Sequence, residues 1–206
     1  MLLPEILSCS EVLKPGSHLF RPGDPADVQY HVRSGALKTY ALNAQGDERV
    51  TGFYLPGEVL SNSQIEGRRR EGAIALETAT VCRLRLQDVG RLQDVAALPM
   101  LMTKLSQRET LLTEHQLNLA GTASLPRFVG FCLQYSARLA KLGRCSQHLP
   151  LPMSRTDIAS YLGMTLESLS RVCAKLSKGG LLLAQPKEMQ LLDRPALEAL
   201  AVPGTY

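Results

Sequence analysis

The chain has 206 residues and a mass of 22.5 kDa, a length that suits one large domain or two small ones. Its composition, 45% hydrophobic and 20% charged, is typical of a folded globular protein and excludes a disordered or fibrous chain. No apolar run reaches the roughly 18 residues of a membrane helix, and the first residues lack the pattern of a signal peptide. We therefore expect a cytoplasmic protein with no membrane partner.

The net charge of +4 is unevenly distributed along the chain. Residues 1–120 contain 13 Lys and Arg against 14 Asp and Glu, whereas residues 121–206 contain 10 against 5. A basic surface displaces condensed counterions from a nucleic acid, although a solvated basic face would give the same count. The charge therefore indicates residues 121–206 as the candidate nucleic-acid-binding part.

Short strand-like segments alternate with turn signals over residues 1–90. Clusters of Gly, Pro, Asn and Asp mark the turns, for example at residues 22–25, 43–47 and 55–58. This pattern predicts a small antiparallel β-barrel or sandwich that ends near residue 95. The segments with the β-branched and aromatic content of strands are residues 30–33, 36–40, 49–54 and 80–86.

A long amphipathic helix is predicted over residues 96–120, because its apolar residues recur at spacings of three, four or seven. Such a helix buries its stripe either on its own domain or on a second copy of itself, as a coiled-coil-like seam. The length of the helix favours the second arrangement, so we expect a homodimer. The stripe consists of Leu98, Leu101, Leu105, Arg108, Leu112, His115 and Leu119.

Residues 149–180 have the pattern of a helix-turn-helix. Ser154 is placed to cap a first helix, Gly163 to form the sharp turn, and Thr165 to cap a second helix. The pattern therefore predicts a winged helix-turn-helix. Its flanking elements are a helix from Arg127 to about Leu142 and a two-stranded wing over residues 181–183 and 189–192.

The second helix of this pair presents Glu167, Ser170 and Arg171 on one face, because they lie at positions i, i+3 and i+4. Arg171 can donate two hydrogen bonds to guanine, Glu167 can accept one from a cytosine amino group, and Ser170 can contact thymine or phosphate. The alternative is an ordinary solvated surface with a local Glu167–Arg171 pair, worth about 0.2 to 0.5 kcal/mol. Phosphate contacts are expected from Arg155, Thr165, Lys175 and Lys178.

The five cysteines are an odd number and contain no Cys-x-x-Cys pair, so neither a disulfide framework nor a zinc site is predicted. Helical spacing places Cys132 and Cys173 inward, as core residues. Cys145 lies in a polar loop and is the better candidate for a reactive thiol. The residues show no nucleophile, acid–base pair or metal-ligand set, so we do not expect an enzyme.

Five segments resemble the CRP/FNR family of bacterial transcription regulators, and its FNR branch most closely. The resemblance implies an α+β fold, with a cyclic-nucleotide-binding-like jelly roll over residues 1–95, a dimerisation helix over 96–120 and a winged helix-turn-helix over 121–206. The segments that carry it are Leu19–Asp24, Arg33–Tyr40, Gln45–Phe53, Ala75–Cys82 and Ser154–Arg171.

The resemblance also implies partners. The Glu-x-x-Ser-Arg pattern of Glu167, Ser170 and Arg171 is that of FNR-type proteins, which implies TTGAT-like half-sites bound by a homodimer. The CRP branch has an additional Arg before the Glu, where this chain has Leu166. In the family, the region of Gly46, Asp47 and Glu48 contacts RNA polymerase, which implies an activator.

The signal that controls the protein stays open. Cyclic-AMP-binding relatives have an intact phosphate cassette and a following Arg, whereas here the cassette is altered and residues 68–70 are three arginines that we expect in an exposed loop. Cys82 matches one ligand of the FNR iron–sulfur cluster, but the three N-terminal cysteine ligands have no counterpart in this sequence. No cofactor is therefore predicted, unless the natural chain extends upstream. The alternatives are a cyclic-nucleotide or small-ligand binding module, and a regulator controlled by thiol oxidation.

Overall fold

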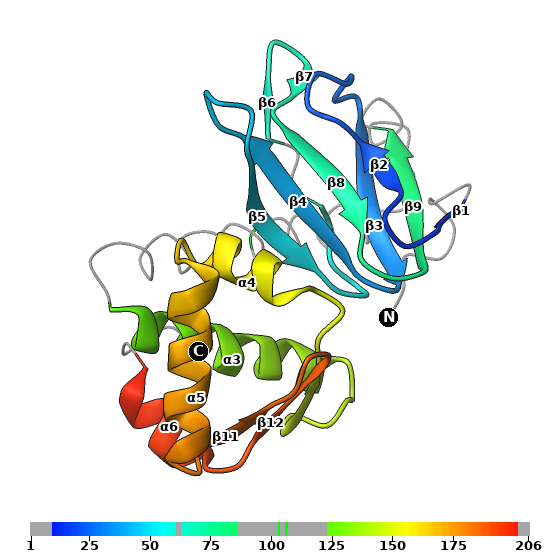
Figure 1. The fold of residues 1–206 in the computed structure, drawn as a ribbon. Coiled ribbons are helices and arrows are strands. Elements are labelled where there is room, and N and C mark those ends of the chain that lie inside the picture. Colours follow the sequence, from blue (N-terminus) through cyan, green and yellow to red (C-terminus); the bar gives the residue numbers. More distant parts are fainter. Residues whose placement is uncertain (1–9, 61–62, 86–102, 104–105, 107–122, 202–206) are drawn as a thin grey trace. The chain divides into compact units, whose positions relative to one another are not determined.

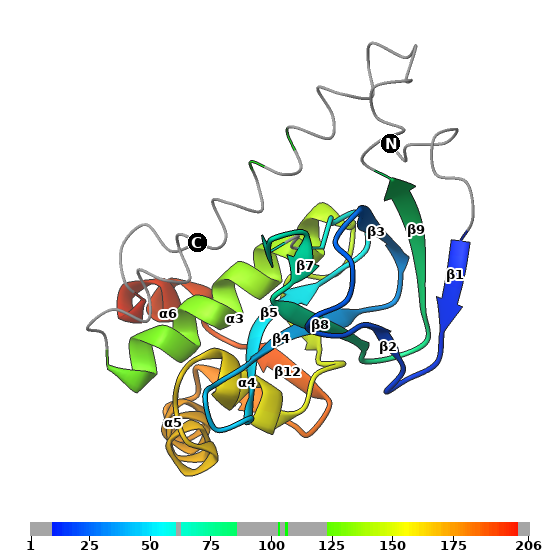
Figure 2. The ribbon, with the colours of Figure 1, turned by 90° about the horizontal axis from the view of Figure 1, so that it is seen from above.

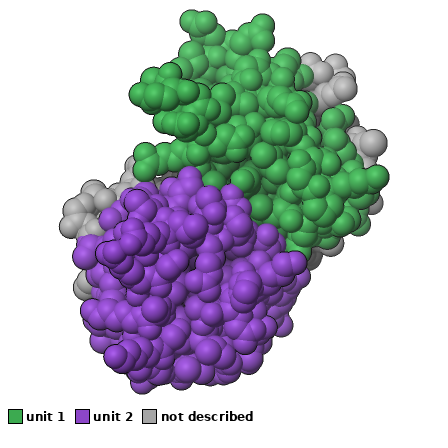
Figure 3. All heavy atoms as spheres, viewed as in Figure 1, with its two compact units in different colours: residues 1–111 green, residues 112–206 purple. Residues whose placement is uncertain are grey.

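The computed structural model describes residues 10–60, 63–85 and 123–201, together with Thr103 and Ser106 (Figure 1). The chain divides into two compact units, Met1–Leu111 and Leu112–Tyr206 (Figure 3). None of the helices within the described ranges is long and apolar enough to span a membrane. The expected boundaries near residues 95 and 120 lie outside the described residues, as do all seven stripe residues, Leu98, Leu101, Leu105, Arg108, Leu112, His115 and Leu119.

The first unit contains two antiparallel sheets and a short hairpin (Figure 1). One sheet has the order β1 (Ser10–Leu13), β9 (Ala79–Arg85) and β3 (Val28–Ser34). The other has the order β2 (His18–Phe20), β8 (Glu71–Ala75), β4 (Leu37–Leu42) and β5 (Glu48–Tyr54). The hairpin pairs β6 (Gln64–Ile65) with β7 (Arg68–Arg69).

The predicted jelly roll is confirmed, but as two open sheets rather than a closed barrel. Over the described residues, each sheet keeps its own edge strands, β1 and β3 in one and β2 and β5 in the other. The hydrogen-bonded ladders therefore do not run around a cylinder, and packing of side chains between the sheets holds the unit together.

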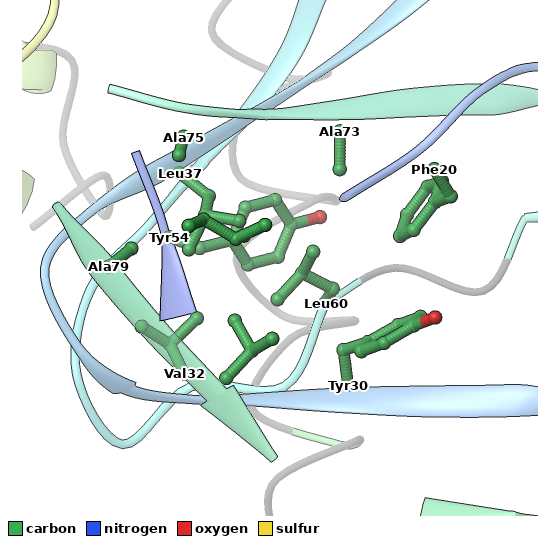
Figure 4. Close-up of a cluster of buried hydrophobic side chains, with 11 residues drawn as sticks. Phe20, Tyr30, Val32, Leu37, Tyr54, Leu60, Ala73, Ala75 and Ala79 are labelled. Atoms are coloured by element: carbon green, nitrogen blue, oxygen red, sulfur yellow. The ribbon is translucent and has the colours of Figure 1, made fainter. Parts of the chain in front are cut away.

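A cluster of buried apolar side chains lies between these sheets (Figure 4). Strand periodicity explains its members, because alternate residues such as Ala73 and Ala75 on β8, or Ala79 and Val81 on β9, face the same side. Burial of a large apolar side chain stabilises the fold by about 1.5 to 3 kcal/mol. The largest members are Leu13, Phe20, Tyr30, Leu37, Tyr54 and Leu60.

The turn between β3 and β4 requires glycine. Gly35 has a φ of +74°, and a Cβ atom there would lie 2.4 Å from the Thr78 carbonyl oxygen and 2.7 Å from the Ala79 Cα. Both the left-handed conformation and the close backbone approach exclude a side chain at this position. The β3–β4 turn can therefore pack directly on the start of β9.

The second unit is a winged helix-turn-helix, as predicted. Its sheet has the order β10 (His148–Pro150), β12 (Glu188–Leu191) and β11 (Leu182–Ala184), so the expected two-stranded wing has a third strand. Helix α6 was not predicted from the sequence; Asp193 caps it by accepting a hydrogen bond from the Ala196 N–H. The helices are α3 (Ser124–Lys141), α4 (Arg155–Tyr161), α5 (Leu166–Lys178) and α6 (Arg194–Leu200).

Helix α3 is the central element of the second unit, since it contacts α5, α6 and β10 (Figure 2). Its residues Phe128, Phe131, Cys132, Tyr135 and Leu139 are buried, as their three- and four-residue spacing predicts. The Phe131 ring meets the Tyr161 ring of α4 edge to face, with 6.0 Å between centroids. The helix-turn-helix therefore rests on α3.

Candidate nucleic-acid interface

Local capping builds the helix-turn-helix. The Ser154 Oγ accepts a hydrogen bond from the Asp157 N–H, and the Asp157 Oδ2 accepts one from the Ser154 N–H, both at 3.0 Å. At the other end of α4, Gly163 adopts a φ of +59°. Thr165 then caps α5, because its Oγ1 accepts a hydrogen bond from the Ser168 N–H at 3.1 Å. The predicted caps and glycine turn are confirmed.

We expect Ser154→Ala to lower the free energy of unfolding by about 1 kcal/mol, because the variant loses the Oγ that accepts from the Asp157 N–H and donates to the Asp157 Oδ2. Urea unfolding followed by circular dichroism measures the change. Thr156→Ala is the matched control, since Thr156 is exposed on the same helix. Equal unfolding midpoints for the two variants would contradict the role of the cap.

Helix α5 has one buried and one exposed face. Leu169, Val172, Cys173 and Leu176 are buried, whereas Glu167, Ser170 and Arg171 are exposed. Without DNA, the Arg171 Nη2 donates to the Glu167 Oε1 at 2.5 Å, and both side chains are more than 70% exposed. An exposed pair of this kind contributes less than about 1 kcal/mol, so it can open at little cost. The three predicted base-reading side chains thus lie together on the exposed face of one helix.

The four residues expected at phosphates lie in two environments. Thr165, Lys175 and Lys178 are exposed on or beside α5, with both lysines in its last turn, where the helix dipole favours cations. Arg155 is half-buried, and its Nη2 donates to the Ala184 carbonyl of β11 at 3.3 Å. Arg155 therefore joins the start of α4 to the wing, a contact that the sequence did not reveal.

Two domain families match the chain. Residues 10–94 match the family model of the cyclic nucleotide-binding domain, and residues 130–200 match that of the Crp-like helix-turn-helix domain. The transcriptional activator protein anr of Pseudomonas aeruginosa is 36% identical over 204 residues, which are 97% of this chain and 83% of that protein. The chain belongs to the CRP/FNR family.

Two other proteins are similar over nearly the whole chain. The transcriptional regulatory protein btr of Bordetella pertussis is 35% identical over 201 residues, 96% of this chain and 83% of that protein. The structure of FixK2 from Bradyrhizobium japonicum superposes with a TM-score of 0.83 at 26% identity, covering 95% of this chain and 98% of that one. This CRP/FNR protein is therefore a DNA-binding transcription regulator and not an enzyme.

In this CRP/FNR protein, the segment predicted to contact polymerase is the turn between β4 and β5. Gly46, Asp47 and Glu48 are exposed there, and Gly46 has a φ of +87°. The Asn43 Oδ1 accepts hydrogen bonds from the N–H groups of Gln45 at 2.9 Å and Asp47 at 2.8 Å. These bonds hold the turn in one conformation and present an acidic surface.

The expected exposed loop at residues 68–70 is only partly right, because Arg68 and Arg70 are exposed but Arg69 is buried. Arg68 and Arg69 form β7, and the Arg69 side chain is buried because its guanidinium lies 3.9 Å from the Phe20 ring centroid. Its Nε donates to the Pro25 carbonyl at 3.2 Å and its Nη2 donates to the Val28 carbonyl. Burial lowers the pKa of Arg69 from its ordinary value, against the opposite influence of Tyr30.

These contacts bear on the nucleotide-binding alternative. The Arg69 donors bind backbone carbonyls, and the Arg68 Nη1 donates to the Gly23 carbonyl at 2.9 Å. In the altered cassette, the Glu58 Oε2 accepts a hydrogen bond from the Leu55 N–H at 3.0 Å. Arg69 and Glu58 are thus engaged with the protein itself, which does not fit a cyclic-nucleotide phosphate and sugar site.

An iron–sulfur cluster does not fit the described residues either. Cys82 is buried on β9, where its strand neighbours are Ser10 on β1 and His31 on β3. The described part of the chain contains no group of three or more His, Cys, Asp or Glu side chains placed to hold a metal ion. Cys82 therefore has no cluster-forming partners there.

The other cysteines lie as their spacing predicts. Cys132 and Cys173 are buried, and burial raises the pKa of both thiols. The Cys132 Sγ also lies 3.4 Å from the Met189 Sδ. Cys145 is exposed, and hydrogen bonds from the N–H groups of Gln147 and His148 lower the pKa of its thiol.

We expect iodoacetamide to alkylate Cys145 before Cys132 and Cys173, because only the thiolate reacts and a lowered pKa populates it at lower pH. The midpoint of the Cys145 rate profile should lie below the ordinary pKa of a free thiol. Peptide mass spectrometry over a pH series measures both effects. Labelling of Cys132 or Cys173 ahead of Cys145 in the native protein would contradict this assignment.

Proposed function

We propose that this CRP/FNR protein binds, as a homodimer, DNA that carries two inverted TTGAT-like half-sites. The observation that carries the proposal is the exposed face of α5, where Glu167, Ser170 and Arg171 stand together. Arg171 donates to the O6 and N7 of guanine, and Glu167 accepts from a cytosine amino group. Together these contacts suit a half-site that contains a G·C base pair. Ser170 is short enough to approach a thymine or a phosphate.

Leu166 supports the FNR type of half-site. It is the first residue of α5 and is 47% exposed. Next to Glu167 it offers an apolar contact to a thymine methyl group, whereas the CRP branch has an arginine at this position.

The backbone of the DNA supplies the rest of the binding energy. Thr165, Lys175 and Lys178 surround the reading face and approach phosphates, while Arg155 first has to release the Ala184 carbonyl. In a two-fold dimer, with the seam formed by the helix over residues 96–120, the two reading helices enter successive major grooves about 34 to 36 Å apart.

We further propose that the dimer acts in the cytoplasm as an activator that contacts RNA polymerase through Gly46, Asp47 and Glu48. The preformed, acidic β4–β5 turn supports this proposal, as does the similarity to the transcriptional activator protein anr of Pseudomonas aeruginosa.

The test is a mobility-shift titration at fixed salt with three duplexes. One carries two inverted TTGAT half-sites with centres one helical turn apart, one carries a single half-site, and one is scrambled. We expect tight binding of two chains to the first duplex, weaker binding to the second and only salt-sensitive binding to the third. Equal affinity for all three duplexes would overturn the proposal, and a bound stoichiometry of one chain would overturn the homodimer.

The alternative function, a nucleotide-binding module without DNA activity, has its own test. Isothermal titration of the protein with cyclic AMP and cyclic GMP should give no heat of binding, because Arg69 and Glu58 are bound to the protein backbone. Saturable binding without any mobility shift would favour the alternative.

A further inference from the structure

We propose that Arg127, a residue of α3 outside the helix-turn-helix, is a positioning residue. It holds the turn between α4 and α5 and thereby fixes the position in which α5 approaches the bases of DNA. The inference rests on the proposed function, since it takes α5 as the helix that reads the bases. Arg127 lies in the first turn of α3, and its Nη1 donates to the Leu162 carbonyl at 2.8 Å and to the Gly163 carbonyl at 3.4 Å.

The two carbonyls that Arg127 binds end α4. Leu162 is the C-cap of that helix, and Gly163 takes the left-handed conformation that follows it. The local hydrogen bonds of the turn satisfy its N–H groups, because Gly163 donates to the Ser160 carbonyl and Met164 to the Ala159 carbonyl. The last carbonyls of a helix have no partner within the helix, so Arg127 supplies one from another element.

The charge of Arg127 points to the same role. A cation in the first turn of a helix is unfavourable, because the N-terminal N–H groups form the positive end of the helix dipole. The first turn of α3 contains no acidic residue that could offset this charge. The carbonyl end of α4 is the negative end of its own dipole and provides that compensation through hydrogen bonds to a charged donor.

The guanidinium of Arg127 is partly shielded from solvent at this contact. Its Nε is buried and has no hydrogen-bond partner among the described residues. Its neighbour Phe128 is fully buried in α3, and Leu162 is buried at the end of α4. The contact therefore joins two packed elements and is not a screened surface interaction.

A shift of this turn would move the reading face. Helix α5 begins at Leu166, directly after its cap Thr165, so little chain separates the carbonyls held by Arg127 from Glu167. A recognition helix contacts bases with its N-terminal residues. A small displacement of these residues breaks the alignment that a bidentate hydrogen bond to a base requires. Loss of the Arg127 contact should thus weaken sequence-specific binding more than general binding to DNA.

The experiment compares two variants. Arg127→Met keeps an aliphatic side chain but has no hydrogen-bond donors, and Arg127→Lys keeps the positive charge but not the planar set of N–H donors of the guanidinium. Lys141→Met is the control, because it removes a charge from the opposite end of α3. Binding to the two-half-site and scrambled duplexes is measured over a salt series. Hydrogen exchange of the Met164 amide, measured without DNA, reports how often the turn opens, because this amide donates to the Ala159 carbonyl.

For Arg127→Met we expect about tenfold weaker binding to the specific duplex, affinity for the scrambled duplex within about twofold, and faster exchange at Met164. The salt slope should not change, because no phosphate contact is lost, whereas loss of one phosphate contact in each chain of the dimer would lower it by about 2. Arg127→Lys should recover part of the specific affinity, and Lys141→Met should match the unmodified protein in Met164 exchange.

Three results would overturn the inference. They are unchanged exchange at Met164, a salt slope lowered by about 2, and equal loss of specific and scrambled binding. Should Arg127→Met fail to fold, Arg127→Lys decides through the same exchange measurement. If the unmodified protein shows no preference among duplexes, the proposed function fails, while the exchange measurement still decides whether Arg127 holds the turn.

Discussion

Replacing Arg171 by alanine is expected to abolish the preference for a TTGAT duplex over a scrambled one. The guanidinium stands exposed on α5 and is the one group of the reading face that can donate two hydrogen bonds to guanine. A bidentate contact discriminates by about 1 to 3 kcal/mol, so a dimer on two half-sites should lose about 2 to 6 kcal/mol of specificity. Competition mobility shifts at one salt concentration measure this ratio.

Two controls separate reading from folding and from charge. Arg171→Ala should change the free energy of unfolding by no more than about 0.5 kcal/mol, because the pair with Glu167 is exposed. Lys178→Ala, at an exposed site on the same helix, should weaken binding to both duplexes alike and lower the salt slope by about 2, one for each chain of the dimer. If Arg171→Ala behaves like Lys178→Ala, the base-reading role of Arg171 is wrong.

Arg69→Met should lower the stability of the first unit substantially. The variant keeps an apolar stem over Phe20 but removes the donors to the Pro25 and Val28 carbonyls and the contact of the charge with the ring. Unsatisfied carbonyls and the lost cation–π contact should together lower the free energy of unfolding by about 2 to 4 kcal/mol. Urea denaturation of the full chain measures the effect.

Arg70→Met is the matched control, because the neighbouring arginine is exposed and its loss should change stability by no more than about 0.5 kcal/mol. Equal effects of the two variants would show that the Arg69 contacts add nothing to stability. Stabilisation of the unmodified protein by phosphate or cyclic AMP, absent in Arg69→Met, would instead make Arg69 an anion-binding residue.

The helix-turn-helix could be predicted because its signals are local. The Ser154 cap, the Gly163 turn and the Thr165 cap each act within three or four residues, and Glu167 and Arg171 share a face by helical geometry alone. The buried stripe of α3 follows from the same periodicity. Helix α6 was not predicted, although its Asp193 cap is an equally local signal.

The sequence by itself thus determined the class of fold, the shared exposed face of Glu167, Ser170 and Arg171 on α5 and the inward position of Cys132 and Cys173, because helical period and capping depend on nearby residues. Only the tertiary structure decided which groups the arginines contact. Arg69 contacts carbonyls more than 40 residues away, and Arg127 contacts a turn 35 residues away. No local pattern distinguishes such residues from surface charges, because their partners are neighbours only after the chain has folded.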